Sequence, residues 1–178
     1  MYDKLFTVSD LVVKYGRVLA LEVERLEAPL GRILIVGPNA SGKTTLIKTL
    51  LGLIKPRRGR VQLLGRDPFK HSSEISRLVT YVRDIDELPP QLKVSTLIEV
   101  LSENFNGESV ESIAKDLGLT EHMGKRLSEL SKGMRRKASL LMALASNREL
   151  VIIDEPFSGL DSKSRITVAD LLDRKKLN

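Results

Sequence analysis

The chain has 178 residues and contains no cysteine, which excludes disulfides and cysteine-ligated metal sites. Hydrophobic residues make up 42% of it and charged residues 29%, a composition typical of a globular protein with one buried core. No apolar run reaches about 18 residues, and no basic segment followed by an apolar one opens the chain. We therefore expect neither a membrane span nor a secretory signal.

The formal net charge of +6 permits nucleotide, nucleic acid or an anionic membrane surface as a partner. Lysine and arginine cluster at residues 55–60, 132–137 and 174–176. These clusters are either binding surfaces for polyanions or solvated faces, and the sequence leaves both interpretations open. Because no aromatic residue lies among them, a platform that stacks single-stranded bases is not expected.

Short apolar runs predict strands, and longer segments with helical spacing predict helices. In chain order, strands are expected at residues 11–13, 19–23, 33–36, 61–64, 78–82 and 150–153. Helices are expected at residues 43–53, 95–102, 109–117, 132–146 and 162–173. Segments 33–36 and 150–153 lack polar alternation, which is typical of buried parallel strands. Since residues 94–129 hold no convincing strand, the sequence predicts a strand-and-helix core with a helical insert.

Residues 37–44 match the pattern G-x-x-x-x-G-K-[ST] of a phosphate-binding loop (P-loop) between an expected strand and an expected helix. Glycines let backbone N–H groups turn toward phosphates, and the helix N-terminus adds its dipole. We expect Lys43 to reach the β- and γ-phosphates and Thr44 to offer its hydroxyl to Mg²⁺. The predicted ATP-binding residues here are Gly37, Pro38, Asn39, Ala40, Ser41, Gly42, Lys43, Thr44 and Thr45.

Two carboxylates follow the expected strand at residues 150–153. A buried strand that ends here brings Asp154 to a Mg²⁺ site, directly or through water. Glu155 lies one step farther along, where it can polarise the attacking water as a general base. The alternative is a strand that simply ends at a polar turn before Pro156.

Two further blocks complete a recognisable order. The sequence Leu-Ser-Lys-Gly-Met at residues 130–134 resembles the LSGGQ signature of ABC-type ATPases, and its Ser131 precedes Asp154 by 23 residues. The sequence Ser-Gly-Leu-Asp at residues 158–161 resembles the D-loop of the same family. The order of P-loop, helical insert, signature, acidic strand and D-loop covers almost the whole chain and is similar to that of ABC transporter ATP-binding subunits.

The resemblance implies an α/β fold with a P-loop NTPase core, mainly a parallel sheet with flanking helices. It adds an N-terminal antiparallel β part and a small α-helical subdomain. We expect residues 1–84 to form the β part and P-loop core and residues 85–130 the helical subdomain. Residues 131–178 then return to the core with the signature helix, acidic strand, D-loop and C-terminal helix.

The resemblance also implies a mechanism in which two such domains pair head-to-tail and enclose ATP and Mg²⁺. Tyr15 then stacks on adenine, a contact of about 1–3 kcal/mol, although a tyrosine at a strand edge is the alternative interpretation. Lys43 and Glu155 are the catalytic residues. Contacts to the nucleotide of the partner chain come from Ser131, Lys132, Gly133 and Asp161.

In that family, ATP hydrolysis powers transport through a separate transmembrane permease subunit. The resemblance therefore implies a cytoplasmic chain, peripheral on the cytoplasmic face of the membrane, that pairs with a second nucleotide-binding domain. Nucleic acid is not an expected partner on this interpretation. Two alternatives stay open: a soluble ABC-type ATPase that acts on ribosomes or DNA, and a catalytically weak module that dimerises with ATP.

Three departures from the family pattern affect these expectations. Lys132 and Met134 replace the glycine and glutamine of the signature. Asp84 stands where the family has its Q-loop glutamine, and it is either a substitute Mg²⁺ ligand or a solvated loop residue. The sequence ends at Asn178, seventeen residues after Asp161, without reaching the position of the family's switch histidine. The rate of hydrolysis is therefore left open.

Overall fold

The structure is a computed structural model that describes residues 2–84 and 88–175. It divides into two compact units, which we call unit 1 (Met1–Leu78) and unit 2 (Val79–Asn178). Lys176 of the third basic cluster lies outside the described residues. The division falls at the start of a strand, whereas the expected parts at residues 1–84, 85–130 and 131–178 remain a prediction.

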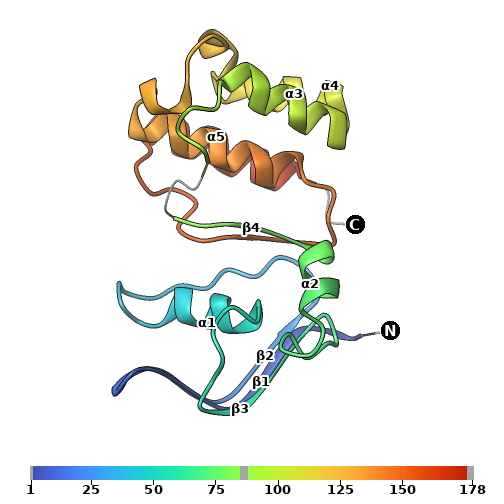
Figure 1. Cartoon of the computed structure of the whole chain (residues 1–178), viewed down its shortest axis with the longest axis vertical. Coiled ribbons are helices and arrows are strands. Elements are labelled where there is room, and N and C mark those ends of the chain that lie inside the picture. The colour runs from blue at the N-terminus through green and yellow to red at the C-terminus, as the bar shows by residue number, and fades with distance from the viewer. Residues whose placement is uncertain (1, 85–87, 176–178) are drawn as a thin grey trace. The chain divides into compact units, whose positions relative to one another are not determined.

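Unit 1 contains an antiparallel sheet with the strand order β2-β1-β3 (Figure 1). Its strands are β1 (Lys4–Tyr15), β2 (Val18–Pro29) and β3 (Arg58–Leu63). The hairpin between β1 and β2 closes where Tyr15 pairs with Val18, and Gly16 in the turn has a φ of 61°. The predicted strands at residues 11–13, 19–23 and 61–64 are confirmed. They are the apolar parts of these elements.

Two helices complete unit 1: α1 (Lys43–Leu50) and α2 (Ser72–Leu78). Helix α1 lies over one face of the sheet (Figure 1). It buries Leu46, Ile47 and Leu50, whose spacing places them on one side of the helix. The helix ends before the predicted residue 53 because Gly52, with a φ of 73°, adopts the left-handed conformation that terminates helices.

The segment at residues 33–36 differs from its prediction. We expected a buried parallel strand, but the structure shows an extended segment that is not a strand, and Leu34 and Val36 are 81% and 82% exposed. An apolar run favours burial, but a strand forms only where a neighbouring strand accepts and donates its backbone hydrogen bonds. Within the described residues, neither sheet supplies that neighbour.

Unit 2 contains two parallel strands, β4 (Val79–Val82) and β5 (Leu150–Ile153). Their register pairs Val82 with Ile153, so the segments that follow the two strands leave the sheet at the same edge. The strands predicted at 78–82 and 150–153 are therefore confirmed. The expected burial of residues 150–153 on both faces is wrong, because each of the four is only partly buried. Their one hydrogen-bonded neighbour among the described residues is β4.

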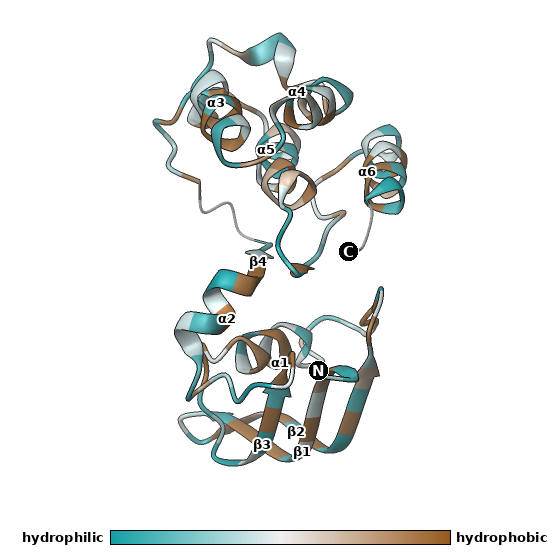
Figure 2. Ribbon diagram, turned by 90° about the vertical axis from the view of Figure 1, so that its right-hand side faces the viewer, coloured by the Kyte–Doolittle hydropathy of each residue, from teal (hydrophilic) through white to brown (hydrophobic). Residues whose placement is uncertain are grey.

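Helices make up most of unit 2: α3 (Val94–Asn104), α4 (Gly107–Asp116), α5 (Lys132–Ala145) and α6 (Ser162–Arg174). Two 3₁₀ turns, Thr120–His122 and Leu127–Glu129, connect them. The apolar sides of α3, α4 and α5 meet in a core that contains fully buried Val94, Val110 and Leu140 (Figure 2). The four helices predicted for this part of the chain are confirmed within a few residues. Among the described helices, none combines the length and apolar character of a membrane span.

Candidate functional site

The P-loop of unit 1 leads into the N-terminus of α1. Ala40 and Gly42 have φ values of 62° and 91°, and left-handed residues in such a loop turn backbone N–H groups into an anion-binding concavity. The sheet also approaches closely here, since a Cβ at residue 42 would lie 2.9 Å from Cδ1 of Leu21 and 3.1 Å from the carbonyl oxygen of Ala20. Both the left-handed conformation and the close sheet therefore favour glycine at residue 42.

Lys43 is the first residue of α1, and its side chain folds back over the loop. Its Nζ donates hydrogen bonds to the carbonyl oxygens of Gly37, at 2.8 Å, and Pro38, at 2.9 Å. No acidic residue lies in the first turn of the helix. Thr44 and Thr45 follow in this turn, Thr44 half-buried and Thr45 buried. Ammonium, helix dipole and inward N–H groups together favour an anion at this position.

Tyr15 ends β1 with its side chain 50% exposed. Val13, two residues earlier, pairs with Leu21, the residue that stands against Gly42. Because side chains alternate along a strand, Tyr15 lies on the same sheet face as Val13, and this is the face that meets the P-loop. This placement agrees with a ring that stacks on a base, and the stacking itself remains a prediction.

The acidic pair follows β5 in unit 2. The Asp154 N–H donates to the carbonyl oxygen of Val82 at 2.8 Å, which extends the β4–β5 ladder, and Asp154 is 5% exposed. Glu155 is exposed and has a φ of 50°, a left-handed conformation that is unusual for a residue other than glycine. Asp154 is therefore fixed by the sheet, while Glu155 is exposed one residue later.

Tyr81 on β4 is close to this pair. Burial and, to a smaller extent, the negative charge of the Asp154 carboxylate together raise the pKa of Tyr81 to about 12, although Arg83 opposes the rise. The phenol therefore stays protonated at neutral pH and adds no negative charge beside Asp154.

The signature begins helix α5. The Ser131 hydroxyl caps this helix by accepting a hydrogen bond from the N–H of Met134 at 3.2 Å. A Cβ at Gly133 would lie 3.0 Å from the carbonyl oxygen of Gly159, and the methylene carbons of Lys132 lie 3.4–3.6 Å from the Cβ position of Gly159. The signature and the D-loop, which are separate in the sequence, are therefore in contact within unit 2.

Asp161 ends the D-loop and caps helix α6. Its carboxylate accepts a hydrogen bond from the N–H of Ser164 at 2.8 Å and one from the Ser164 hydroxyl at 3.2 Å. The hydrogen bond from the Ser164 N–H lowers the pKa of Asp161, so the cap is ionised at neutral pH. This structural role does not test the predicted contact of Asp161 with nucleotide.

Mg²⁺ is compatible with the residues present. Among the described residues, no group of three or more histidine, cysteine, aspartate or glutamate side chains could hold a metal ion by itself. Mg²⁺ at an ATP site needs only one or two carboxylates, because phosphate and water oxygens supply the other ligands. In unit 1, Thr44 offers a hydroxyl in the first turn of α1; in unit 2, Asp154 offers a buried carboxylate, and Asp84 is exposed two residues after the end of β4.

Sequence reasoning missed Arg136. We assigned it to the basic cluster at residues 132–137, but its side chain is only 2% exposed. The sequence could have predicted this burial, because Leu140 and Ala143 follow Arg136 at helical spacing on the buried side of α5.

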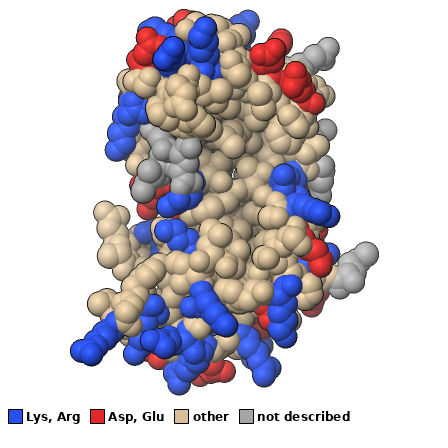
Figure 3. Space-filling model, viewed as in Figure 1, with Lys and Arg blue, Asp and Glu red and all other residues tan. Residues whose placement is uncertain are grey.

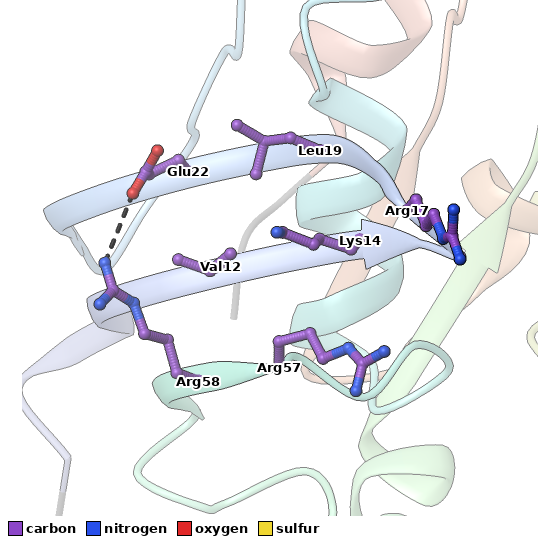
Figure 4. A pocket seen from close by; sticks show the side chains of 8 residues that line it. Val12, Lys14, Arg17, Leu19, Glu22, Arg57 and Arg58 are labelled. Atoms are coloured by element: carbon purple, nitrogen blue, oxygen red, sulfur yellow. Dashed lines mark hydrogen bonds and ion pairs between the residues drawn. The ribbon is translucent and has the colours of Figure 1, made fainter.

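A hollow of about 630 Å³ opens on unit 1, on the sheet face of Val12 and Lys14, away from the P-loop (Figure 4). It is lined by Val12, Lys14, Gly16, Arg17, Leu19, Glu22, Arg57 and Arg58. Arg58 forms an ion pair with Glu22 at 3.4 Å. Within the part of the chain that the structure describes, Lys14, Arg17 and Arg57 form no ion pair.

The positive charge of the protein is concentrated in unit 1. This unit holds fourteen lysine and arginine residues against seven aspartate and glutamate residues, whereas unit 2 holds fifteen against sixteen. Figure 3 shows Lys and Arg side chains gathered over the part of the molecule that β1–β3 form. The net charge of +6 therefore comes from the unit that carries the P-loop and the basic hollow.

Known proteins are similar to this chain in sequence and in fold. The chain is 33% identical over 150 residues to the manganese transport system ATP-binding protein MntA of Synechocystis sp. (strain ATCC 27184 / PCC 6803 / Kazusa), which covers 78% of this chain and 57% of that protein. It is 35% identical over 148 residues to the uncharacterized ABC transporter ATP-binding protein YtlC of Bacillus subtilis (strain 168), covering 80% of this chain and 55% of that one. It thus spans little more than half the length of these relatives.

A solved structure of an ATP-binding subunit of an ABC transporter superposes with a TM-score of 0.80 at 24% identity, covering 96% of this chain and 74% of that chain. This likeness identifies the α/β fold of P-loop ATPases, with its antiparallel β part and its helices. A family model described as ABC transporter matches residues 26–158, from the second strand to the D-loop. Since this match includes most of the sequence, the chain belongs to the ABC transporter family.

Proposed function

We propose that this chain binds ATP with Mg²⁺ and hydrolyses it to power transport through a separate transmembrane permease subunit. The observation that carries the proposal is the P-loop, in which Lys43, two left-handed residues and the start of α1 favour one anion position. Membership of the ABC transporter family supports ATP as the ligand and transport as the process. The chain then lies on the cytoplasmic face of the membrane.

Each site residue has a separate proposed role in ATP binding and hydrolysis. Lys43 binds the β- and γ-phosphates, and in doing so it exchanges the carbonyl oxygens of Gly37 and Pro38 for phosphate oxygens. Thr44 and Asp154 hold Mg²⁺, with Asp84 as a further ligand. When bound, Mg²⁺ neutralises charge on the phosphate oxygens. Glu155 takes a proton from the attacking water, a role for which its exposed carboxylate is suited.

A second nucleotide-binding domain completes the proposed site. Two such domains pair head-to-tail. The nucleotide held by the partner is then contacted by four residues of this chain: Ser131, Lys132, Gly133 and Asp161. The contact between the signature and the D-loop supports this arrangement, because it presents both motifs on one surface of unit 2. The permease docks near residues 84–102, of which residues 85–87 lie outside the described part of the chain.

An affinity capture tests this function directly. We expect Glu155→Gln with ATP·Mg²⁺ to co-purify a multi-span membrane protein from detergent-solubilised native cells, because blocked hydrolysis prolongs the ATP-bound assembly. Mass spectrometry identifies the partner. Lys43→Ala, which we expect to bind ATP poorly, serves as the matched control and should not enrich the same protein. Recovery of the chain without a membrane protein would contradict the transporter assignment.

The basic hollow favours a second candidate, a soluble ABC-type ATPase that acts on ribosomes or DNA. Three cations that form no ion pair with any residue the structure describes line a concave surface on the unit with the excess positive charge. Such a surface attracts a phosphate backbone, and its affinity falls steeply with salt because bound counterions are released.

Removal of these cations distinguishes the two candidates. If the second one holds, a triple variant with alanine at Lys14, Arg17 and Arg57 should weaken RNA or duplex DNA binding and reduce the slope of log affinity against log salt by about two to three units, roughly 0.9 per lost phosphate contact. The control removes three exposed cations elsewhere: Lys70, Arg77 and Lys115. Fluorescence anisotropy from 50 to about 200 mM salt measures both. Equal slopes for the two triple variants would reject the nucleic-acid role of the hollow.

A further inference from the structure

Arg136 is a buried cation that contacts the backbone just beyond the ends of both parallel strands of unit 2. Its Nη1 donates to the carbonyl oxygen of Arg83 at 2.5 Å. Its Nη2 donates to the carbonyl oxygens of Asp154, at 2.6 Å, and Glu155, at 2.7 Å. The side chain comes from α5 and is 2% exposed, so the guanidinium makes these hydrogen bonds away from solvent.

The three carbonyl groups lie at one end of the β4–β5 sheet, where the acidic residues of the proposed site follow the strands. Strands β4 and β5 are parallel and in register, so the carbonyl of Arg83 and those of Asp154 and Glu155 follow the same end of the sheet. Arg83 immediately precedes Asp84. One guanidinium therefore anchors the backbone at Asp154, at Glu155 and at the residue before Asp84, the three acids that we assign to Mg²⁺ and to catalysis.

The arginine side chain is suited to this task for two physical reasons. A guanidinium cannot relieve its burial by losing a proton, so it needs acceptors in fixed positions, and its planar fork can reach several at once. Glu155 has a strained left-handed backbone, and its carbonyl oxygen accepts from Arg136 and from the N–H of Ser158 at 3.1 Å. These two hydrogen bonds fix the peptide that determines where the Glu155 carboxylate points.

Arg136 also links two motifs through one rigid element. Helix α5 starts at the Ser131 cap and carries Arg136 little more than one turn later. A displacement of the signature end of the helix is therefore transmitted to the carbonyl groups of the acidic pair. We infer that Arg136 is a positioning residue that sets the Asp154–Glu155 turn and couples it to the signature helix. This inference rests on the proposed function, in which these two acids act on ATP.

The test compares Arg136→Lys with Arg135→Lys in the full chain. Lysine keeps the charge but cannot span two strands with one ammonium group. Arg135, the neighbouring residue on the same helix, donates to the carbonyl oxygen of Leu130 at 2.7 Å, so it is the matched control. Arg136→Gln, which removes the buried charge, provides a second variant if the lysine variant folds poorly.

We expect Arg136→Lys and Arg136→Gln to lower kcat on the order of 10- to 100-fold, because a misplaced catalytic group loses about this much, with KM for ATP nearly unchanged. The Arg135→Lys variant should keep both constants. Amide hydrogen exchange should accelerate at Asp154 and Ser158 and stay constant at Leu141 in the middle of α5. This pattern separates positioning of the turn from general loss of stability.

Two results would overturn the inference. One is a kcat for both Arg136 variants within about twofold of the unmodified chain; the other is exchange that accelerates equally at Leu141 and at the turn. Glu155→Gln is measured in the same series. If that variant retains full turnover, the assignment of Glu155 as the base is wrong; if the unmodified chain has no turnover, the proposed hydrolysis is wrong. In either case the exchange measurement alone decides whether Arg136 holds the turn.

Discussion

Replacing Lys43 with alanine should weaken ATP binding on the order of 10- to 150-fold. The ammonium is the one side-chain cation of the P-loop, and a hydrogen bond to a charged partner contributes about 1.5–3 kcal/mol. The variant also loses the two hydrogen bonds to the carbonyl oxygens of Gly37 and Pro38. Isothermal titration calorimetry with ATP·Mg²⁺ measures the affinity, and the midpoint of thermal unfolding reports whether the loop remains folded.

Lys48→Ala is the control for this prediction. Lys48 lies in the last turn of the same helix, five residues after Lys43, so the substitution removes the same charge at the end far from the loop. We expect its ATP affinity to remain close to that of the unmodified chain. If Lys43→Ala binds ATP as tightly as Lys48→Ala does, the P-loop is not the nucleotide site of this chain.

Replacing Glu155 with glutamine should reduce ATP turnover on the order of 10²- to 10⁴-fold, the usual contribution of a general base. The amide keeps the size of the side chain but cannot accept the proton. Binding of ATP should persist, because the P-loop is unchanged, and an ATP-bound dimer should accumulate. Single-turnover kinetics measures the chemical step, and light scattering after size-exclusion chromatography measures the mass of the assembly.

Glu149→Gln tests the specificity of this effect. Glu149 is exposed and precedes β5, at the end of the strand opposite to Glu155, so its loss should leave turnover unchanged. Equal turnover in the two glutamine variants would reject Glu155 as the base. An unmodified chain that dimerises with ATP but does not turn it over would favour the catalytically weak dimerisation module, and a Glu155→Gln chain that remains monomeric with ATP would contradict the head-to-tail pairing.

Local sequence determined the elements that depend on near neighbours. The strand at residues 150–153 was predicted at its observed bounds, because an apolar run ends abruptly at two carboxylates. Helix α5 was predicted within one residue, since Ser131 caps its start and apolar residues repeat at helical spacing. The P-loop pattern likewise placed the start of α1 at Lys43, where the structure has it. The roles of the site residues remain predictions.

Tertiary structure decided what depends on distant partners. The apolar character of residues 33–36 predicted a strand, but pairing requires a neighbour that the run itself cannot specify. The basic cluster at residues 132–137 includes Arg136, which is buried and whose three carbonyl acceptors belong to residues 18 to 53 positions away in the sequence. Sequence therefore determined composition, motif order and local helix and strand preference. Only the folded chain decided burial and pairing, because both depend on contacts between segments that are far apart in the sequence.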